Sequence, residues 1–134
     1  MSDSPWLVGV DHVAIAAVDP GHPLVRLLEW PRMIDKVMPS GVHVAKYGLG
    51  GTQIEVVNPE CAPTPIDRFL AQRGPGLHHV ALIARGDLSE IQATLSRLGL
   101  GPGPIESAAD GRPSLFLHPQ SCGGVLIEIV QDGR

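Results

Sequence analysis

Two histidines and two glutamates lie inside apolar stretches of this chain, and they are the residues best suited to chemistry. Glu55 and Glu128 each follow a glycine pair and an isoleucine and each precede aliphatic residues, in segments 50–57 and 123–130. His12 and His79 each lie in an apolar segment that opens with glycine. A charge buried in such a strand must be paired, protonated or bound to a metal. The four residues therefore predict a metal or catalytic site.

The histidine and glutamate segments recur in the same order and at similar spacing, which indicates two copies of one unit. Each copy is typical of a β-α-β-β-β module, so we predict an α+β fold of two modules related by a pseudo-twofold axis. Module one covers 8–59, a linker helix covers 64–73 and module two covers 76–131. A half of about 65 residues is only marginally stable alone, so residues 1–134 are expected to form a single domain.

The elements of each module follow from the pattern of apolar residues and turn signals. In module one we expect strands over 8–17, 33–38, 42–47 and around Glu55, with a short helix over 24–30. In module two we expect a strand around His79 and later strands around 105, over 113–118 and around Glu128. Thr64 is expected to cap the linker helix, and Asp87 to cap a helix that ends at Gly99.

Strand alternation places each of the four residues on one defined face. If the sheets of the two modules curve toward each other, the two imidazoles and two carboxylates meet in one apolar cleft. That donor set suits a divalent ion such as Co, Ni, Mn, Zn or Fe(II), with positions left for water or a bidentate substrate. A core histidine or a solvent-facing glutamate is the plainer interpretation of any one residue, but the repetition of all four favours function.

Composition excludes several other classes of function. The net charge of −4 and the presence of only two lysines argue against a nucleic-acid partner, which needs a clustered basic face. We find no apolar run long enough for a membrane span and no signal-peptide pattern, so a cytoplasmic location is expected. Cys61 and Cys122 lack metal or disulfide spacing and are expected to be reduced thiols.

The sequence resembles the vicinal oxygen chelate superfamily, whose members fold as paired β-α-β-β-β modules, and within it the methylmalonyl-CoA epimerases. The resemblance lies in four segments that include the strands of both modules, namely residues 10–16, 53–59, 76–81 and 118–131. It implies a metal-dependent epimerase of 2-substituted malonyl-type acyl-CoA thioesters and a homodimer. It also implies that the metal ligands are His12, Glu55, His79 and Glu128, with Co the favoured ion.

The implied reaction removes the proton from the carbon between a thioester and a carboxylate and returns one to the other face. A divalent ion acting as a Lewis acid would stabilise the enolate. Glu128 is the first candidate for the catalytic base, and Glu55 is a second candidate for the opposite face. A carboxylate in an apolar cleft can have its pKa tuned for such proton transfer.

Further residues are candidates for substrate binding. His43 and His118 lie on the third strands of the two modules and could line the cleft. Ser121 and Gly123 could present backbone N–H groups to an oxyanion or carboxylate, and Gln120 stands where the resembling epimerases usually carry a lysine. The segment 39–44 lacks the acid that one epimerase has been proposed to use as a second base.

Two other functions use the same fold. One is a glyoxalase I-like lyase or isomerase acting on a thiol adduct with the same ligands. The other is a metal-free binding protein of the drug-resistance type, which needs aromatic pocket walls and no ligand set. Aromatic residues make up only 4% of this chain, and all four candidate ligands are present, which favours catalysis.

Overall fold

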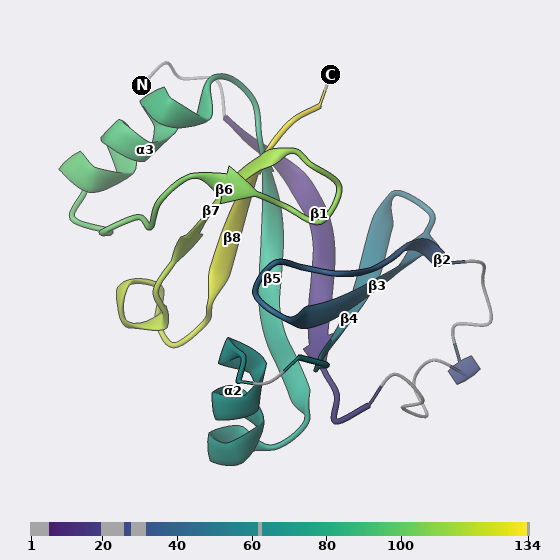
Figure 1. Cartoon of the computed structure of the whole chain (residues 1–134). Helices are drawn as coiled ribbons and strands as arrows, with labels where there is room; N and C mark the ends of the chain where they lie inside the picture. Colours follow the sequence, from purple (N-terminus) through teal and green to yellow (C-terminus); the bar gives the residue numbers. More distant parts are fainter. Residues whose placement is uncertain (1–5, 20–25, 28–31, 62, 134) are drawn as a thin grey trace. The chain divides into compact units, whose positions relative to one another are not determined.

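The computed structural model describes residues 6–19, 26–27, 32–61 and 63–133. Over these residues the chain forms one mixed sheet of eight strands with two α-helices, shown in Figure 1. The α+β class expected from the sequence is confirmed. Arg26 and Leu27 are helical, and the rest of the short helix expected over 24–30 lies outside the described residues. No helix in the described ranges is long and apolar enough to cross a membrane.

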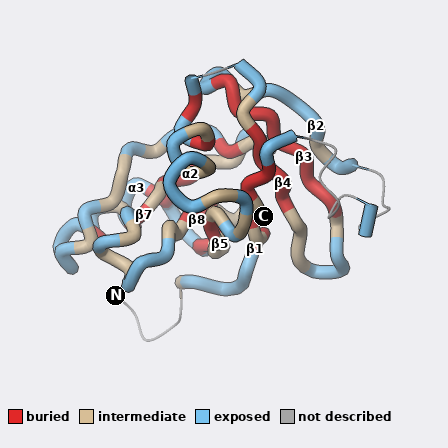
Figure 2. Tube along the Cα trace, turned by 90° about the horizontal axis from the view of Figure 1, so that it is seen from below, coloured by how far each residue is buried: buried red, intermediate tan, exposed pale blue. Residues whose placement is uncertain are grey.

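The strands of module one match the expected pattern closely. They are β1 (Leu7–Ala16), β2 (Arg32–Val37), β3 (Val42–Leu49) and β4 (Thr52–Pro59). β1 pairs with β4 in parallel, β4 pairs with β3 antiparallel, and β3 pairs with β2 antiparallel. Figure 2 shows buried residues running along β3 and β4, whereas β2 is mostly exposed. The charged side chains of β2 suit an edge strand, because they discourage pairing with another chain.

Module two repeats this arrangement. Its strands are β5 (Gly76–Ala84), β6 (Glu106–Ser107), β7 (Pro113–Leu117) and β8 (Ile127–Gln131), and a 3-10 turn, η1 (Pro119–Ser121), precedes β8. β5 pairs with β8 in parallel, and the β7–β8 and β6–β7 pairs are antiparallel. β8 begins later than the apolar segment 123–130 suggests, because Gly123 and Gly124 both adopt positive φ angles in a turn.

The order of strands in the sheet is β2-β3-β4-β1-β5-β8-β7-β6. The chain divides into two compact units, unit 1 with residues 1–11 and 79–134 and unit 2 with residues 12–78. The divisions fall inside β1 and β5, so each of these strands contributes residues to both units. The single domain and the module limits expected from the sequence stay predictions.

The two helices begin at the residues that the sequence predicts. Thr64 caps α2 (Pro65–Arg73), and Thr64 and Asp67 form a capping box in which each side chain accepts a backbone N–H. Asp87 caps α3 (Leu88–Arg97) by accepting from the Ser89 backbone N–H at 2.8 Å. These bonds satisfy amide groups that have no partner within the helix.

Each unit has its own apolar core. In unit 1, α3 packs against β7 and β8 through a cluster that includes Leu88, Leu95, Leu115 and Ile129. In unit 2, Ala17, Ala45, Tyr47 and Val56 form a second cluster. A fully buried valine, leucine or isoleucine side chain contributes about 1.5–3 kcal/mol to stability. In unit 2 the cluster takes up one face of β3 and β4, and the residues that alternate with it lie on the other face.

Candidate metal centre

In unit 2, the pairing of β1 with β4 brings His12 and Glu55 onto one face. The parallel register places Ala14 opposite Glu55, so His12, two residues earlier, lies on the same side of the sheet as the carboxylate. The His12 Nε2 and Glu55 Oε2 atoms are 3.5 Å apart, and both side chains are buried. This unit thus holds one buried imidazole–carboxylate pair.

In unit 1, the same arrangement recurs with His79 and Glu128. The register of β5 with β8 places Ala81 opposite Glu128, which is the equivalent of the pairing of Ala14 with Glu55. His79 Nε2 lies 3.2 Å from Glu128 Oε1, and both side chains are again buried. The Phe116 ring meets the His79 ring edge-on, with centroids 5.4 Å apart. The repeat seen in the sequence is therefore also a repeat of local geometry.

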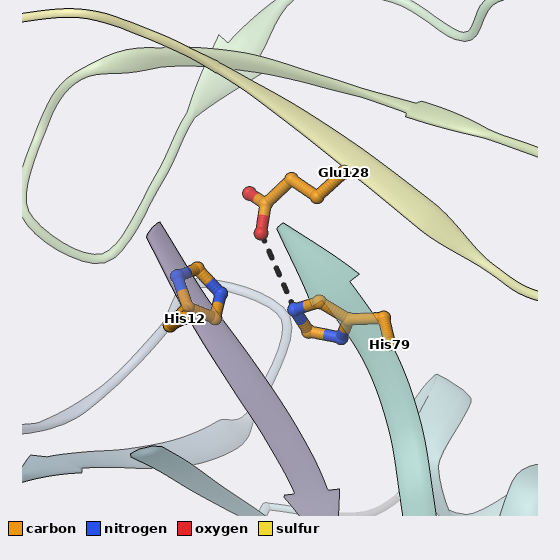
Figure 3. Close-up of side chains that lie close together, drawn as sticks. All are labelled: His12, His79 and Glu128. Atoms are coloured by element: carbon orange, nitrogen blue, oxygen red, sulfur yellow. Dashed lines mark ion pairs between the residues drawn. The ribbon is translucent and has the colours of Figure 1, made fainter. Parts of the chain in front are cut away.

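Three of the four predicted ligands form a group that could hold a metal ion. His12, His79 and Glu128 each offer one ligand atom, and these atoms lie within 4.8 Å of one another (Figure 3). Two imidazole nitrogens and one carboxylate oxygen are a donor set that suits a divalent transition metal and leaves coordination positions open. The residues therefore fit the ion that the sequence leads us to expect. Glu55 lies outside this group, beside His12, and its role as a fourth ligand stays a prediction.

The sequence reasoning missed one charged residue beside these pairs, Lys46. It lies opposite Glu55 in the register of β3 with β4, and its Nζ is 3.8 Å from Glu55 Oε2. Only 1% of Lys46 is exposed. A lysine inside an otherwise apolar strand was the available signal, but its cross-strand neighbour depends on a register that the sequence does not fix.

His43 lies on the face of β3 opposite to Lys46 and takes part in a separate polar network. Its Nδ1 is 2.9 Å from Asn58 Oδ1, and its Nε2 is 2.6 Å from Asp35 Oδ1. Hydrogen bonds from Arg32 and from His43 hold the pKa of Asp35 below its usual value. The structure does not bring His43 to the Glu55 face, and its contact with substrate stays a prediction.

The remaining predicted binding residues lie in the turn before β8. The His118 Nδ1 atom accepts a hydrogen bond from the Gln120 backbone N–H at 3.1 Å, which caps η1. Ser121 ends this turn, and Gly123 follows with φ 69°, a conformation that glycine adopts readily. His118, Gln120 and Gly123 are exposed. A role for any of these residues in substrate binding stays a prediction.

Two contacts support the backbone next to the candidate ligands. Asp11 precedes His12 and accepts a hydrogen bond from Arg112 at 2.7 Å, and Arg112 also bonds Asp110. Burial opposes the charge of Arg112, but these carboxylates outweigh it and raise the pKa of the guanidinium. In unit 2, His78 packs edge-on against Phe69 of α2, with ring centroids 4.9 Å apart.

Comparison with known proteins identifies methylmalonyl-CoA epimerases among the relatives of this chain. The mouse mitochondrial methylmalonyl-CoA epimerase is 32% identical over 147 residues, which cover 97% of this chain and 77% of the relative. The ethylmalonyl-CoA/methylmalonyl-CoA epimerase of Cereibacter sphaeroides is 37% identical over 99 residues, which cover 68% of this chain and 70% of the relative. No family model matches the sequence.

Solved structures give the same result. The crystal structure of methylmalonyl-CoA epimerase from Mycobacterium tuberculosis has a TM-score of 0.82 at 25% identity and covers 100% of this chain and 94% of its own. A selenomethionine crystal structure of methylmalonyl-CoA epimerase has a TM-score of 0.85 at 27% identity. The match covers 98% of this chain and 100% of the epimerase chain. With the fold, the repeated His–Glu pairs and the relatives in agreement, this chain belongs to the methylmalonyl-CoA epimerase family of the vicinal oxygen chelate superfamily.

Proposed function

We propose that this enzyme epimerises the α-carbon of a malonyl-type acyl-CoA thioester, using a divalent ion held by His12, His79 and Glu128. The observation that carries the proposal is the buried group of two imidazoles and one carboxylate with ligand atoms within 4.8 Å of one another. Membership of the epimerase family supports the reaction class. Relatives named for methylmalonyl-CoA and ethylmalonyl-CoA support the substrate class.

The protein's own residues account for the proton transfers. Glu128 is the proposed base for the α-proton, because it is buried and a carboxylate has one oxygen to hold an ion and another to accept a proton. Glu55, paired with His12 in the other module, is proposed to serve the opposite face of the carbon. A divalent ion at this position supplies a Lewis acid for the oxyanion that proton removal creates.

Several finer expectations belong to this proposal. Cobalt is the ion that the resemblance to the epimerases favours. Ni, Mn, Zn and Fe are alternatives, because imidazole and carboxylate ligands suit all of them. The homodimer and the cytoplasmic location expected from the sequence also stay predictions.

The proposal is tested by following solvent deuterium exchange at the α-carbon of (2R)- and (2S)-methylmalonyl-CoA. We expect exchange from both isomers with the Co-loaded protein and none with the metal-free protein. Absence of exchange with each of the five ions would contradict the assigned reaction.

The metal site is tested separately by measuring Co affinity of His12→Ala and His79→Ala. Loss of residues that only support a ligand costs about 10–100-fold in metal affinity, so loss of a ligand should cost more than about 100-fold. His78→Ala is the matched control, since His78 neighbours His79 and packs against Phe69 instead. Equal losses in His78→Ala and His79→Ala would show that the ligand assignment is wrong.

A further inference from the structure

The two modules differ at one position next to their glutamates. In module two, the residue opposite Glu128 on the neighbouring antiparallel strand is Phe116. In module one, the residue at the equivalent place, opposite Glu55, is Lys46. Directly opposed residues of two strands project to the same face and contact each other. The two otherwise similar pairs therefore have different third neighbours, an aromatic ring in one module and an ammonium group in the other.

The Lys46 side chain approaches the same carboxylate oxygen that faces the histidine. Glu55 Oε2 lies 3.8 Å from Lys46 Nζ and 3.5 Å from His12 Nε2. Lys46, Glu55 and His12 are all buried, so solvent screens their charges weakly. One oxygen of Glu55 thus lies near both the Lys46 Nζ and a proposed metal ligand.

This geometry has a consequence for a bound ion. An ammonium group and a divalent cation attract the same carboxylate oxygen, and they repel each other at short range in a medium of low dielectric constant. A carboxylate already held by an ammonium therefore gains less from a second cation than a carboxylate in apolar surroundings. Glu55 also lies outside the group of three ligands that the structure brings together.

We propose that Lys46 is a positioning residue that holds the Glu55 carboxylate and competes with the divalent ion for it. The ion is then bound mainly by His12, His79 and Glu128, with an affinity lowered by the adjacent positive charge. The inference rests on the proposed metal site and adds a residue that weakens metal binding while keeping Glu55 in place.

The test measures Co affinity by competition with a chromophoric chelator at one fixed pH. Lys46→Met keeps an unbranched side chain that is one atom shorter and removes its charge, and we expect it to tighten Co binding at least about tenfold. Lys36→Met is the matched control, because Lys36 is the other lysine of the chain and lies exposed on β2. The Lys36→Met protein should bind Co with an affinity within about twofold of that of the wild type. Lys46→Arg retains the charge, so its Co affinity should also stay close to that of the wild type.

A double-mutant cycle isolates the competition. We expect Glu55→Gln to weaken Co binding at least about tenfold more in the Lys46→Met background than in the wild type, because only the freed carboxylate can reach the ion. Equal losses in the two backgrounds would overturn the inference. So would a Lys46→Met affinity within twofold of that of Lys36→Met.

A spectroscopic measurement covers the case in which Lys46→Met does not fold. The visible absorption of bound Co(II) reports its ligands, so Glu55→Gln alone should leave the spectrum unchanged while Glu128→Gln alters it. A spectrum altered by Glu55→Gln would show that Glu55 ligates the ion despite Lys46, and the inference would fail. A wild-type protein that binds no Co would remove both this inference and the proposed metal site, whereas Co binding without any effect of Lys46 would remove the inference alone.

Discussion

The two modules keep the same register but differ in the surroundings of their glutamates. In both, the residue two positions after the histidine pairs with the glutamate, which places each imidazole within 3.5 Å or less of a carboxylate. In module one the glutamate faces Lys46, and in module two the histidine contacts the ring of Phe116. The two modules therefore share a backbone geometry, but their two carboxylates have different chemical surroundings.

This difference favours a division of labour between Glu128 and Glu55. The residue opposite Glu128 is a neutral aromatic ring, which does not compensate the charge of the carboxylate. A carboxylate beside an ammonium group has part of its charge already compensated. We therefore expect the reaction to depend more on module two than on module one.

The largest expected effect is on proton transfer. Glu128→Gln should lower α-deuterium exchange about 10²–10⁴-fold, the usual contribution of a general base, because the amide cannot accept the proton. Glu55→Gln should lower exchange less for at least one of the two isomers. Exchange is followed by mass spectrometry on Co-loaded proteins. Equal losses for both isomers in both variants would break the proposed asymmetry.

The substitution Phe116→Lys would make module two resemble module one. Phe116→Lys places an ammonium group opposite Glu128 and removes the edge contact with His79. Two unit charges about 4 Å apart interact by roughly 4 kcal/mol at an effective dielectric constant of 20, so a loss of Co affinity of at least about tenfold is a conservative expectation. Phe116→Met is the control for the loss of the ring. Unchanged Co affinity in Phe116→Lys would mean that this position does not influence the ion.

The third prediction compares the two units through their helix caps. Thr64→Ala removes the cap of α2 in unit 2, and Asp87→Ala removes the cap of α3 in unit 1. Each should lower the free energy of unfolding by about 1 kcal/mol, as measured by urea denaturation. Ser89→Ala, at an exposed position in α3, should have little effect. A second transition in either cap variant would show that the two units unfold separately.

The smallest expected effect concerns the polar network on β2. Because the pKa of Asp35 is lowered in the folded state, its ionised form adds stability above the unfolded pKa of about 3.9. That contribution disappears as the pH falls through the lower, folded pKa. Asp35 is 43% exposed, so the difference between wild type and Asp35→Asn should stay below about 1 kcal/mol at neutral pH. It should shrink on acidification, and a difference that grows instead would contradict the sign.

The sequence predicted the parts of the fold that depend on local patterns. The repeat, the strands carrying the four candidate ligands and the caps at Thr64 and Asp87 all follow from apolar alternation and turn or cap residues. Lys46 was missed because its importance depends on which residue of β4 lies opposite it. A strand's own sequence does not determine that register, since pairing is set by the turn and by the packing of both faces.

His43 illustrates a second limit of the sequence. Its place on the third strand of module one predicts a contact with substrate, which stays a prediction, and the structure puts His43 on the opposite face of β3 from Lys46. There it lies within hydrogen-bonding distance of Asn58 and Asp35. Which face of a strand meets the site follows from the sheet as a whole, because both faces of β3 are buried and the pattern of apolar residues does not distinguish them.

The ion pair of Arg112 with Asp11 joins positions 101 residues apart in the chain. Asp11 is the residue directly before His12. The turn between β6 and β7 that carries Arg112 therefore constrains the backbone from which the first imidazole projects. Redesign of that turn offers a way to shift the position of His12 indirectly, without replacing any of the candidate ligands.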